Sequence, residues 1–252
     1  MKRALVLIYG ILSYAVFFAT FLYSIGFIGN FGVPKSIDSI PTVGLGVAIL
    51  TNLGLLTVFA LQHSVMARPW FKRILTRWIP QAAERSTYCL FASLALILLF
   101  VGWQPMGGTV WSLEAPVLRI GLYTVFALGW VLIFISTFAI NHFDLFGLRQ
   151  VWDYARNRTY YPPEFKEPVL YRIVRHPLYV GWLVVLWATP TMTMAHLLFA
   201  LATTAYTLIA IQFEEKDLAD MHPEYRVYKK RVPMLIPRFS KRKTTPRSEQ
   251  VA

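Results

Sequence analysis

Arginine, histidine and tyrosine are grouped in the stretch RHPLYVGW, residues 175–182, directly at the start of a long apolar run. Ionisable groups at the rim of a membrane segment are costly to place, so they indicate function by default. Proline suits the first turn of a helix, where its missing N–H costs no hydrogen bond. The stretch therefore predicts the mouth of a membrane helix, with Arg175 and His176 just outside it. In the alternative interpretation these residues are an interfacial anchor, because amphipathic side chains often decorate helix ends.

Two adjacent carboxylates, Glu214 and Glu215, end the apolar run that begins at Leu178. The C-terminus of a helix carries the negative end of its dipole, so acidic side chains are poorly placed there without a cation. We therefore expect a cationic partner, which is either an arginine or a charged ligand. In the alternative interpretation the partner is Arg175 or Arg231, and the ion pair only holds the C-terminal segment down.

Two histidines with polar neighbours lie at the ends of two other apolar runs. His142 lies in the sequence NHFD, residues 141–144, and His63 lies in the sequence QHS. Imidazole titrates near neutral pH, so both are candidate proton acceptors. The alternative for His142 and Asp144 is a helix C-terminal cap that binds main chain.

The composition is that of a membrane protein rather than a soluble domain. Of the 252 residues, 56% are hydrophobic and 15% are charged, and several apolar runs approach the length that crosses a bilayer. The net charge of +12 lies mainly in short loops and the C-terminal tail, which is the positive-inside pattern and argues against nucleic-acid binding. The single cysteine, Cys89, is interpreted as a small core residue.

The apolar runs predict an all-α integral membrane protein with five to six transmembrane helices, including a C-terminal helical hairpin. Four runs cover residues 4–28, 42–66, 87–103 and 117–140, and a fifth covers residues 178–213. The fifth run is too long for one span and is broken near Thr189-Pro190, so two shorter helices folded as a hairpin fit it better. We divide the chain into transmembrane helices (1–140), a region with the hairpin (141–238) and a disordered basic tail (239–252).

The distribution of Lys and Arg predicts which loops share a side of the membrane. The N-terminus, the loops 67–86 and 141–177 and the tail are expected in the cytoplasm, with the loops 29–41 and 104–116 on the other side. This topology brings polar residues from three helix ends to one rim, and His63 joins them from a fourth. The other members are His142, Asp144, Arg149, Arg175, His176, Tyr179, Glu214 and Glu215.

An ordered series of motifs in the C-terminal half resembles the isoprenylcysteine carboxyl methyltransferase superfamily, integral membrane enzymes that use S-adenosylmethionine. The series is Arg175-His176-Pro177-x-Tyr179-x-Gly181, Glu214-Glu215-x-x-Leu218, Tyr225-x-x-Tyr228 and Val232-Pro233. The block NHFDLFGLRQ, residues 141–150, together with LQHS (61–64) and Arg68, more particularly resembles the bacterial methanethiol S-methyltransferases, which make dimethyl sulfide. The resemblance covers the chain from the second apolar run to Pro237.

The resemblance implies that the C-terminal half binds S-adenosyl-L-methionine, with a cofactor-binding C-terminal segment in the cytosol. His176 and Tyr179 would line the pocket, Glu214 or Glu215 would pair with a cation, and Tyr225 and Tyr228 would close the adenosine side. Backbone near Pro177, Leu178 and Gly181 would also approach the cofactor, since glycine lets a helix come close to another group. Aromatic faces also suit a sulfonium.

The implied reaction is methyl transfer to a small alkyl thiol, which must attack as a thiolate. His142 is the first candidate for the base and His63 the second, and Asp144 is expected to orient His142. Arg149 or Arg175 would stabilise the thiolate electrostatically. No spacing typical of a metal site is present, so no metal is expected.

Two other functions stay open at this point. One is methylation of a lipidic acceptor, either a prenylcysteine carboxylate or a phospholipid. The other is a non-enzymatic, NnrU-like membrane protein, which shares the general architecture. The expected partners are the thiol and membrane lipid, and the expected location is the bacterial inner membrane with both termini in the cytoplasm.

Overall fold

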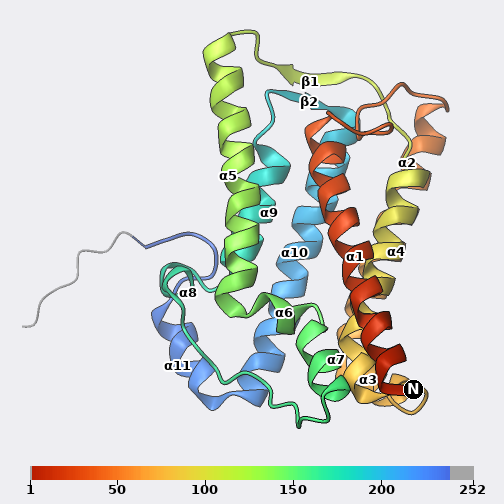
Figure 1. Cartoon of the computed structure of the whole chain (residues 1–252). Coiled ribbons are helices and arrows are strands. Elements are labelled where there is room, and N and C mark those ends of the chain that lie inside the picture. Colours follow the sequence, from red (N-terminus) through yellow and green to blue (C-terminus); the bar gives the residue numbers. More distant parts are fainter. Residues whose placement is uncertain (1, 239–252) are drawn as a thin grey trace, which may run out of the picture.

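The computed structural model describes residues 2–238, and the tail 239–252 that we predict to be disordered lies outside them. Five helices are long and apolar enough to cross a membrane, and they run side by side in Figure 1. They are α1 (Lys2–Gly29), α2 (Leu45–Ala67), α4 (Glu84–Gly102), α5 (Pro116–Ile140) and α10 (Met194–Met221). The all-α membrane fold predicted from the apolar runs is thereby confirmed.

Short helices connect the long ones, mostly at one end of the bundle. They are α3 (Pro69–Leu75), α6 (His142–Leu145), α7 (Leu148–Ala155), α8 (Val169–Ile173), α9 (Pro177–Trp187) and α11 (Pro223–Arg231), with a 3₁₀ turn at Gln81–Ala83. The end that carries α3, α7 and α11 is called the basic end, because these helices bear Lys72, Arg149 and Lys229. The opposite end carries the short antiparallel strands β1 (Thr109–Ser112) and β2 (Thr191–Thr193), which pair Trp111 with Met192.

The hairpin predicted for the fifth apolar run is present, but its two arms are unequal. Helix α9 has 11 residues and ends at Trp187, whereas α10 has 28 residues and continues to Met221. Glu214 and Glu215 therefore lie inside a helix and not at its C-terminus, which corrects the expectation drawn from the helix dipole. The sequence after Glu215, KDLADM, is polar but contains no helix breaker before Pro223, so the helix outlasts its apolar stretch.

Residues with left-handed backbone redirect the chain where α5 ends. Asn141 ends α5 with φ of 94°, and Gly147 separates α6 from α7 with φ of 87°. Gly147 also lies against α4, because a Cβ at this position would lie 2.6 Å from the backbone nitrogen of Ser86. Only glycine satisfies both demands without strain. These two turns place His142 and Asp144 at the basic end.

The close approach expected of Gly181 is an approach between helices. A Cβ on Gly181 would lie 3.0 Å from the carbonyl oxygen of Gly129 and 2.7 Å from Cγ1 of Ile133, both on α5. The glycine pair lets α5 and α9 pack at short distance, as small residues do in membrane helices. A direct contact of Gly181 with a cofactor stays a prediction, since helix packing already accounts for its missing side chain.

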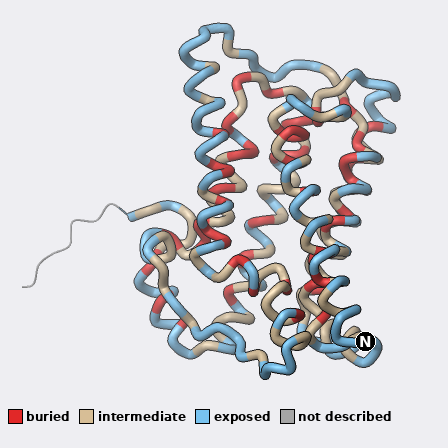
Figure 2. The backbone as a smooth tube through the Cα atoms, viewed as in Figure 1, coloured by how far each residue is buried: buried red, intermediate tan, exposed pale blue. Residues whose placement is uncertain are grey.

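The packed core lies between the helices toward the strand end. Its largest members include Phe27 of α1, Leu99 of α4, Trp103 directly after α4 and Phe199 of α10, and each is at most 6% exposed. Large apolar side chains on the outer faces are exposed, and the buried residues form stripes on the inner faces in Figure 2. An apolar exterior around a packed interior is what lipid contact requires.

Candidate functional site

Glu215 is the centre of a buried ion cluster that joins three elements of the basic end. Glu215 is 1% exposed. Its carboxylate accepts hydrogen bonds from Arg175 Nε at 2.6 Å, Lys229 Nζ at 2.8 Å and His176 Nε2 at 3.0 Å. Arg175 and His176 precede α9, Glu215 lies on α10 and Lys229 on α11. We call these four residues the Glu215 clamp. A buried carboxylate persists only with such partners.

The clamp also fixes the segment that follows α11. The backbone N–H of Arg175 donates to the carbonyl of Pro233 at 2.8 Å, and its Nη1 donates to the carbonyls of Lys229 at 2.9 Å and Val232 at 2.5 Å. Arg175 therefore bonds both to the carboxylate of Glu215 and to main-chain oxygens of residues 229–233. Glu215 thus pairs with Arg175, one of the two arginines named in the alternative interpretation, and this ion pair holds the C-terminal segment.

Glu214, the neighbouring carboxylate, has a more open environment. Its Oε2 accepts from the Tyr179 hydroxyl at 2.8 Å, and its side chain is 44% exposed. His176 donates from Nε2 to Glu215, so its free ring nitrogen is Nδ1, which lies 4.0 Å from Glu214 Oε2. His176 Nδ1 and the carboxylate of Glu214 therefore lie next to the clamp and keep capacity for further hydrogen bonds. With Tyr179 they form an edge that a ligand can contact.

His142 is buried among aromatic rings, with both ring nitrogens engaged. Thr137 Oγ1 donates its only proton to the carbonyl of Phe134 at 2.7 Å, so it accepts from His142 Nδ1 at 2.8 Å. The neutral ring then accepts at Nε2 from the Tyr14 hydroxyl at 2.8 Å, and the Phe138 ring stacks on it at 4.3 Å. Burial lowers the pKa of His142, which keeps this neutral tautomer.

Asp144 does not contact His142, contrary to the expectation that it orients the ring. Its carboxylate accepts from Tyr160 at 2.7 Å, from Gln150 Nε2 at 2.8 Å and from Arg149 Nη1 at 3.1 Å. Residues two apart on a helical turn point to different sides, so His142 faces α1 while Asp144 faces α7 and the loop after it. Burial and the hydrogen bond to Asp144 raise the pKa of Tyr160 to about 12.

His63 belongs to a separate polar group between α2 and α4. The Tyr88 hydroxyl lies 2.8 Å from His63 Nε2, and the Arg85 guanidinium lies over the Tyr88 ring at 5.6 Å. On the neighbouring side, the hydroxyls of Ser64 and Tyr206 are 3.1 Å apart. We call the residues His63, Ser64, Tyr88 and Tyr206 the inner hydroxyl cluster. His63 and Ser64 lie in the LQHS motif, whereas Tyr88 and Tyr206 belong to no motif quoted from the sequence.

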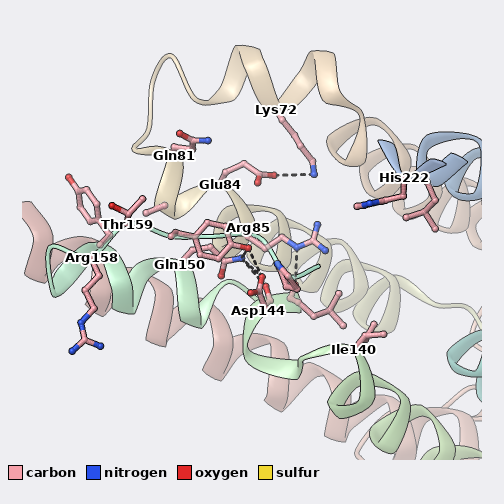
Figure 3. Close-up of a pocket in the computed structure, with 16 residues that line it drawn as sticks. Lys72, Gln81, Glu84, Arg85, Ile140, Asp144, Gln150, Arg158, Thr159 and His222 are labelled. Atoms are coloured by element: carbon pink, nitrogen blue, oxygen red, sulfur yellow. Dashed lines mark hydrogen bonds and ion pairs between the residues drawn. The ribbon is translucent and has the colours of Figure 1, made fainter. Parts of the chain in front are cut away.

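A cavity of about 780 Å³ opens at the basic end, between the start of α4, the α6–α7 turn and the end of α10. Figure 3 shows Lys72 facing Glu84 on one side, and Asp144 with Gln150 on the other. Arg85 also lines the cavity, which therefore adjoins the inner hydroxyl cluster through the Tyr88 ring. Leu218 and His222 border it one turn and two turns beyond Glu214.

Tyr225 and Tyr228, expected to close the adenosine side, are packed inside the basic end. They are 2% and 3% exposed and pack with Val232 and the Phe165 ring. The Tyr228 hydroxyl donates to the carbonyl of Tyr171 at 2.5 Å, whereas the buried Tyr225 hydroxyl has no partner among residues 2–238. Pro177 and Leu178 begin α9 beside the clamp. Contacts of these four residues with a cofactor stay predictions.

A bundle of five membrane-length helices with an ion cluster and a polar cavity at one end defines a multi-pass α-helical membrane protein with an end-on polar site. The chain is 55% identical to the methanethiol S-methyltransferase of Crocosphaera subtropica, over 96% of this chain and 95% of that protein. It is 50% identical to the methanethiol S-methyltransferase of Mycobacterium tuberculosis, over 94% and 98%. The chain belongs to the methanethiol S-methyltransferase family. The family resemblance seen in the block 141–150 is thereby confirmed.

More distant similarity extends to animal proteins. The chain is 33% identical to Nurim of Sus scrofa over 184 residues, which is 68% of each chain. No family model matches the chain. No solved structure matches it either.

Proposed function

We propose that this protein transfers a methyl group from S-adenosyl-L-methionine to methanethiol and so produces dimethyl sulfide. The observation that carries the proposal is the near full-length identity of 55% with a methanethiol S-methyltransferase. Identity at this level, spread over 96% of the chain, includes the helices that build the clamp, the inner hydroxyl cluster and the cavity. The acceptor is accordingly a small thiol and not a lipid.

The residues at the basic end fit the proposed methyl donor in size and charge. The cavity of about 780 Å³ lies in the range of sites for ligands of this size. Cationic and anionic side chains both line it, and the buried Oε1 atoms of Glu84 and Gln150 have no hydrogen-bond partner among residues 2–238. When bound, the donor supplies a methyl group activated on a sulfonium. Glu214, with Tyr179, is suited to hold positive charge next to this cavity.

The chain's own task toward the acceptor is to remove the thiol proton and hold sulfur in line with the methyl group. We assign the proton transfer to His63, because its partner Tyr88 contacts Arg85, which lines the cavity. His142 has both nitrogens bonded to hydroxyls and faces α1, so we assign it a positioning role at the α1–α6 contact. The sequence favours His142 over His63 as the base, and we propose the reverse order.

The charge distribution supports a proposal for the location. Lysines and arginines are concentrated in the segments of the basic end, so we propose that this end and both termini face the cytoplasm of a bacterial inner membrane. The water-soluble methyl donor would then reach the cavity from the cytoplasm. Methanethiol and dimethyl sulfide are small and weakly polar, and both can partition into the bilayer that surrounds the helices.

The experiment uses the full chain purified in detergent, with S-adenosylmethionine and methanethiol, and measures dimethyl sulfide in the headspace. We expect product only when both substrates and folded protein are present. A matched sample of Glu214→Gln should form at least tenfold less product at the same protein concentration. If the folded protein binds S-adenosylmethionine without forming dimethyl sulfide, methanethiol is not the acceptor. If it neither binds the donor nor forms product, the proposed activity is wrong.

A further inference from the structure

Arg85 is half-buried, and within residues 2–238 its guanidinium contacts the Tyr88 ring but pairs with no carboxylate. Its Nε donates to the carbonyl of Leu145 at 2.9 Å, which fixes the direction of the side chain. Other arginines of the basic end have carboxylate partners, with Arg68 at 3.0 Å from Asp217 and Arg175 at 2.6 Å from Glu215. Among residues 2–238, no carboxylate forms an ion pair with Arg85. Its remaining N–H groups are thus available at the cavity wall.

Two acceptors at the same cavity are left without donors. The amide of Gln150 is oriented by its Nε2, which donates to Asp144 Oδ1 at 2.8 Å and to the Asp144 carbonyl at 3.0 Å. These acceptors exclude the flipped amide, so the unpartnered atom is Oε1. Glu84 Oε1 is also without a hydrogen bond, and its ion pair with Lys72 Nζ is long, at 3.8 Å. A buried acceptor without a donor is costly, and a ligand that supplies one is favoured.

Arg158 also lines the cavity but does not share this arrangement. It is exposed, and in Figure 3 it extends away from Glu84 and Asp144. Arg85, by contrast, follows Glu84 directly in the chain and lies beside the Asp144–Gln150 pair in the same view. One fixed cation and two acceptors without a hydrogen bond therefore meet at one part of the wall.

We propose that this part of the wall binds the α-amino-acid end of the methyl donor, with Arg85 on its carboxylate and Glu84 and Gln150 on its ammonium group. A guanidinium matches a carboxylate in a planar, two-point contact, and an ammonium group supplies three donors. An α-amino acid carries both groups on one carbon, which suits a wall with both kinds of partner side by side. The inference rests on the proposed function, because it concerns the donor of that reaction.

The test compares two ligands that differ in this end. S-adenosylhomocysteine carries the carboxylate and the ammonium group, whereas 5′-methylthioadenosine keeps the nucleoside and the sulfur but lacks both. Binding of each to the full chain in detergent is measured by equilibrium dialysis, without methanethiol and without turnover. The variants are Arg85→Gln and Glu84→Gln, and the control is Arg73→Gln, which removes a charge from an exposed position on α3.

We expect Arg85→Gln to weaken S-adenosylhomocysteine binding at least tenfold, about 1.4 kcal/mol, and to change methylthioadenosine binding less than twofold. Glu84→Gln, which keeps the shape of the side chain, should weaken S-adenosylhomocysteine selectively as well, and Arg73→Gln should leave both ligands unchanged. Thermal unfolding of each variant confirms that folded proteins are compared. If Arg85→Gln is not folded, Glu84→Gln alone decides.

The outcomes separate the two proposals. If wild-type protein binds S-adenosylhomocysteine and both variants affect the two ligands equally or not at all, the inference about Arg85 is overturned while the proposed donor stands. If folded wild-type protein binds neither ligand, the proposed donor itself is wrong. Selective loss of the ligand with the amino-acid end supports both.

Discussion

The Glu215 clamp predicts that Arg175 is needed for the fold before it is needed for any ligand. Replacing Arg175 by alanine removes the shortest ion pair of Glu215, at 2.6 Å, and two hydrogen bonds to the carbonyls of Lys229 and Val232. The carboxylate left behind is 1% exposed and retains only His176 and Lys229. Removing one partner of a buried ion pair costs about 3–5 kcal/mol.

The size of the loss can be measured by unfolding in detergent. For a chain of this length, about 3–5 kcal/mol corresponds to a decrease in Tm of roughly 6–20 °C. The informative companion is the double variant Arg175→Met/Glu215→Leu, which removes both charges and leaves apolar side chains of similar length. We expect it to recover part of the loss, because no unpaired carboxylate stays buried.

The matched control is Glu214→Gln, at the adjacent position and 44% exposed on its side chain. It should unfold within about 0.5 kcal/mol of the wild type, as exposed substitutions do. Two results would contradict this reasoning: Arg175→Ala unfolds like the wild type, or the double variant is less stable than Arg175→Ala. In either case the Glu215 carboxylate would not be a buried charge that needs Arg175 as its partner. Loss of activity alone in Arg175→Ala would not rescue the argument.

Three further predictions concern other parts of the molecule. Glu214→Gln should lower kcat/KM at least tenfold in the headspace assay while leaving Tm unchanged. Normal turnover of this variant would show that Glu214 and Tyr179 are not part of the active site. Gly181→Ala should destabilise the protein by about 1–3 kcal/mol, because its Cβ would overpack the backbone of α5, and an unchanged Tm would contradict this crossing. The pKa of Tyr160 is raised to about 12 in the folded chain, so its contribution to stability is present below pH 10 and is lost as the pH rises from 10 to 12. Tyr160→Phe should reduce that alkaline loss, as measured by unfolding between pH 9 and 12, and an identical pH profile would refute it.

The membrane fold could be predicted from the sequence because hydropathy and charge are summed over whole runs. Each of the four long apolar runs before the hairpin lies within three residues of the helix observed, at both ends. The hairpin followed from length and from the break near Pro190. The end of α10 could not be read in the same way, because hydropathy marks where a helix leaves the apolar region and not where it stops.

Partners across the bundle were harder to predict than positions along the chain. The rim residues do gather at the basic end, yet His142 pairs with Tyr14, 128 positions away, and not with its neighbour Asp144. Arg85 and Tyr88 carried no motif, so only the packing of α2 on α4 shows that they adjoin His63. Sequence spacing determines which residues share a helix face, whereas the partner of that face depends on the tertiary packing.

The adjacent carboxylates of α10 illustrate how one motif can hold two roles. Consecutive residues of an α-helix point about 100° apart, so Glu214 and Glu215 face different neighbours although their backbones are continuous. Glu215 points inward, where Arg175, Lys229 and the Nε2–H of His176 bind its carboxylate and hold α9, α10 and α11 together. Glu214 points toward Tyr179 and keeps a side chain that solvent can reach. The buried member therefore fixes the helix from which the open member is presented, and substitutions at the two positions should separate stability from activity.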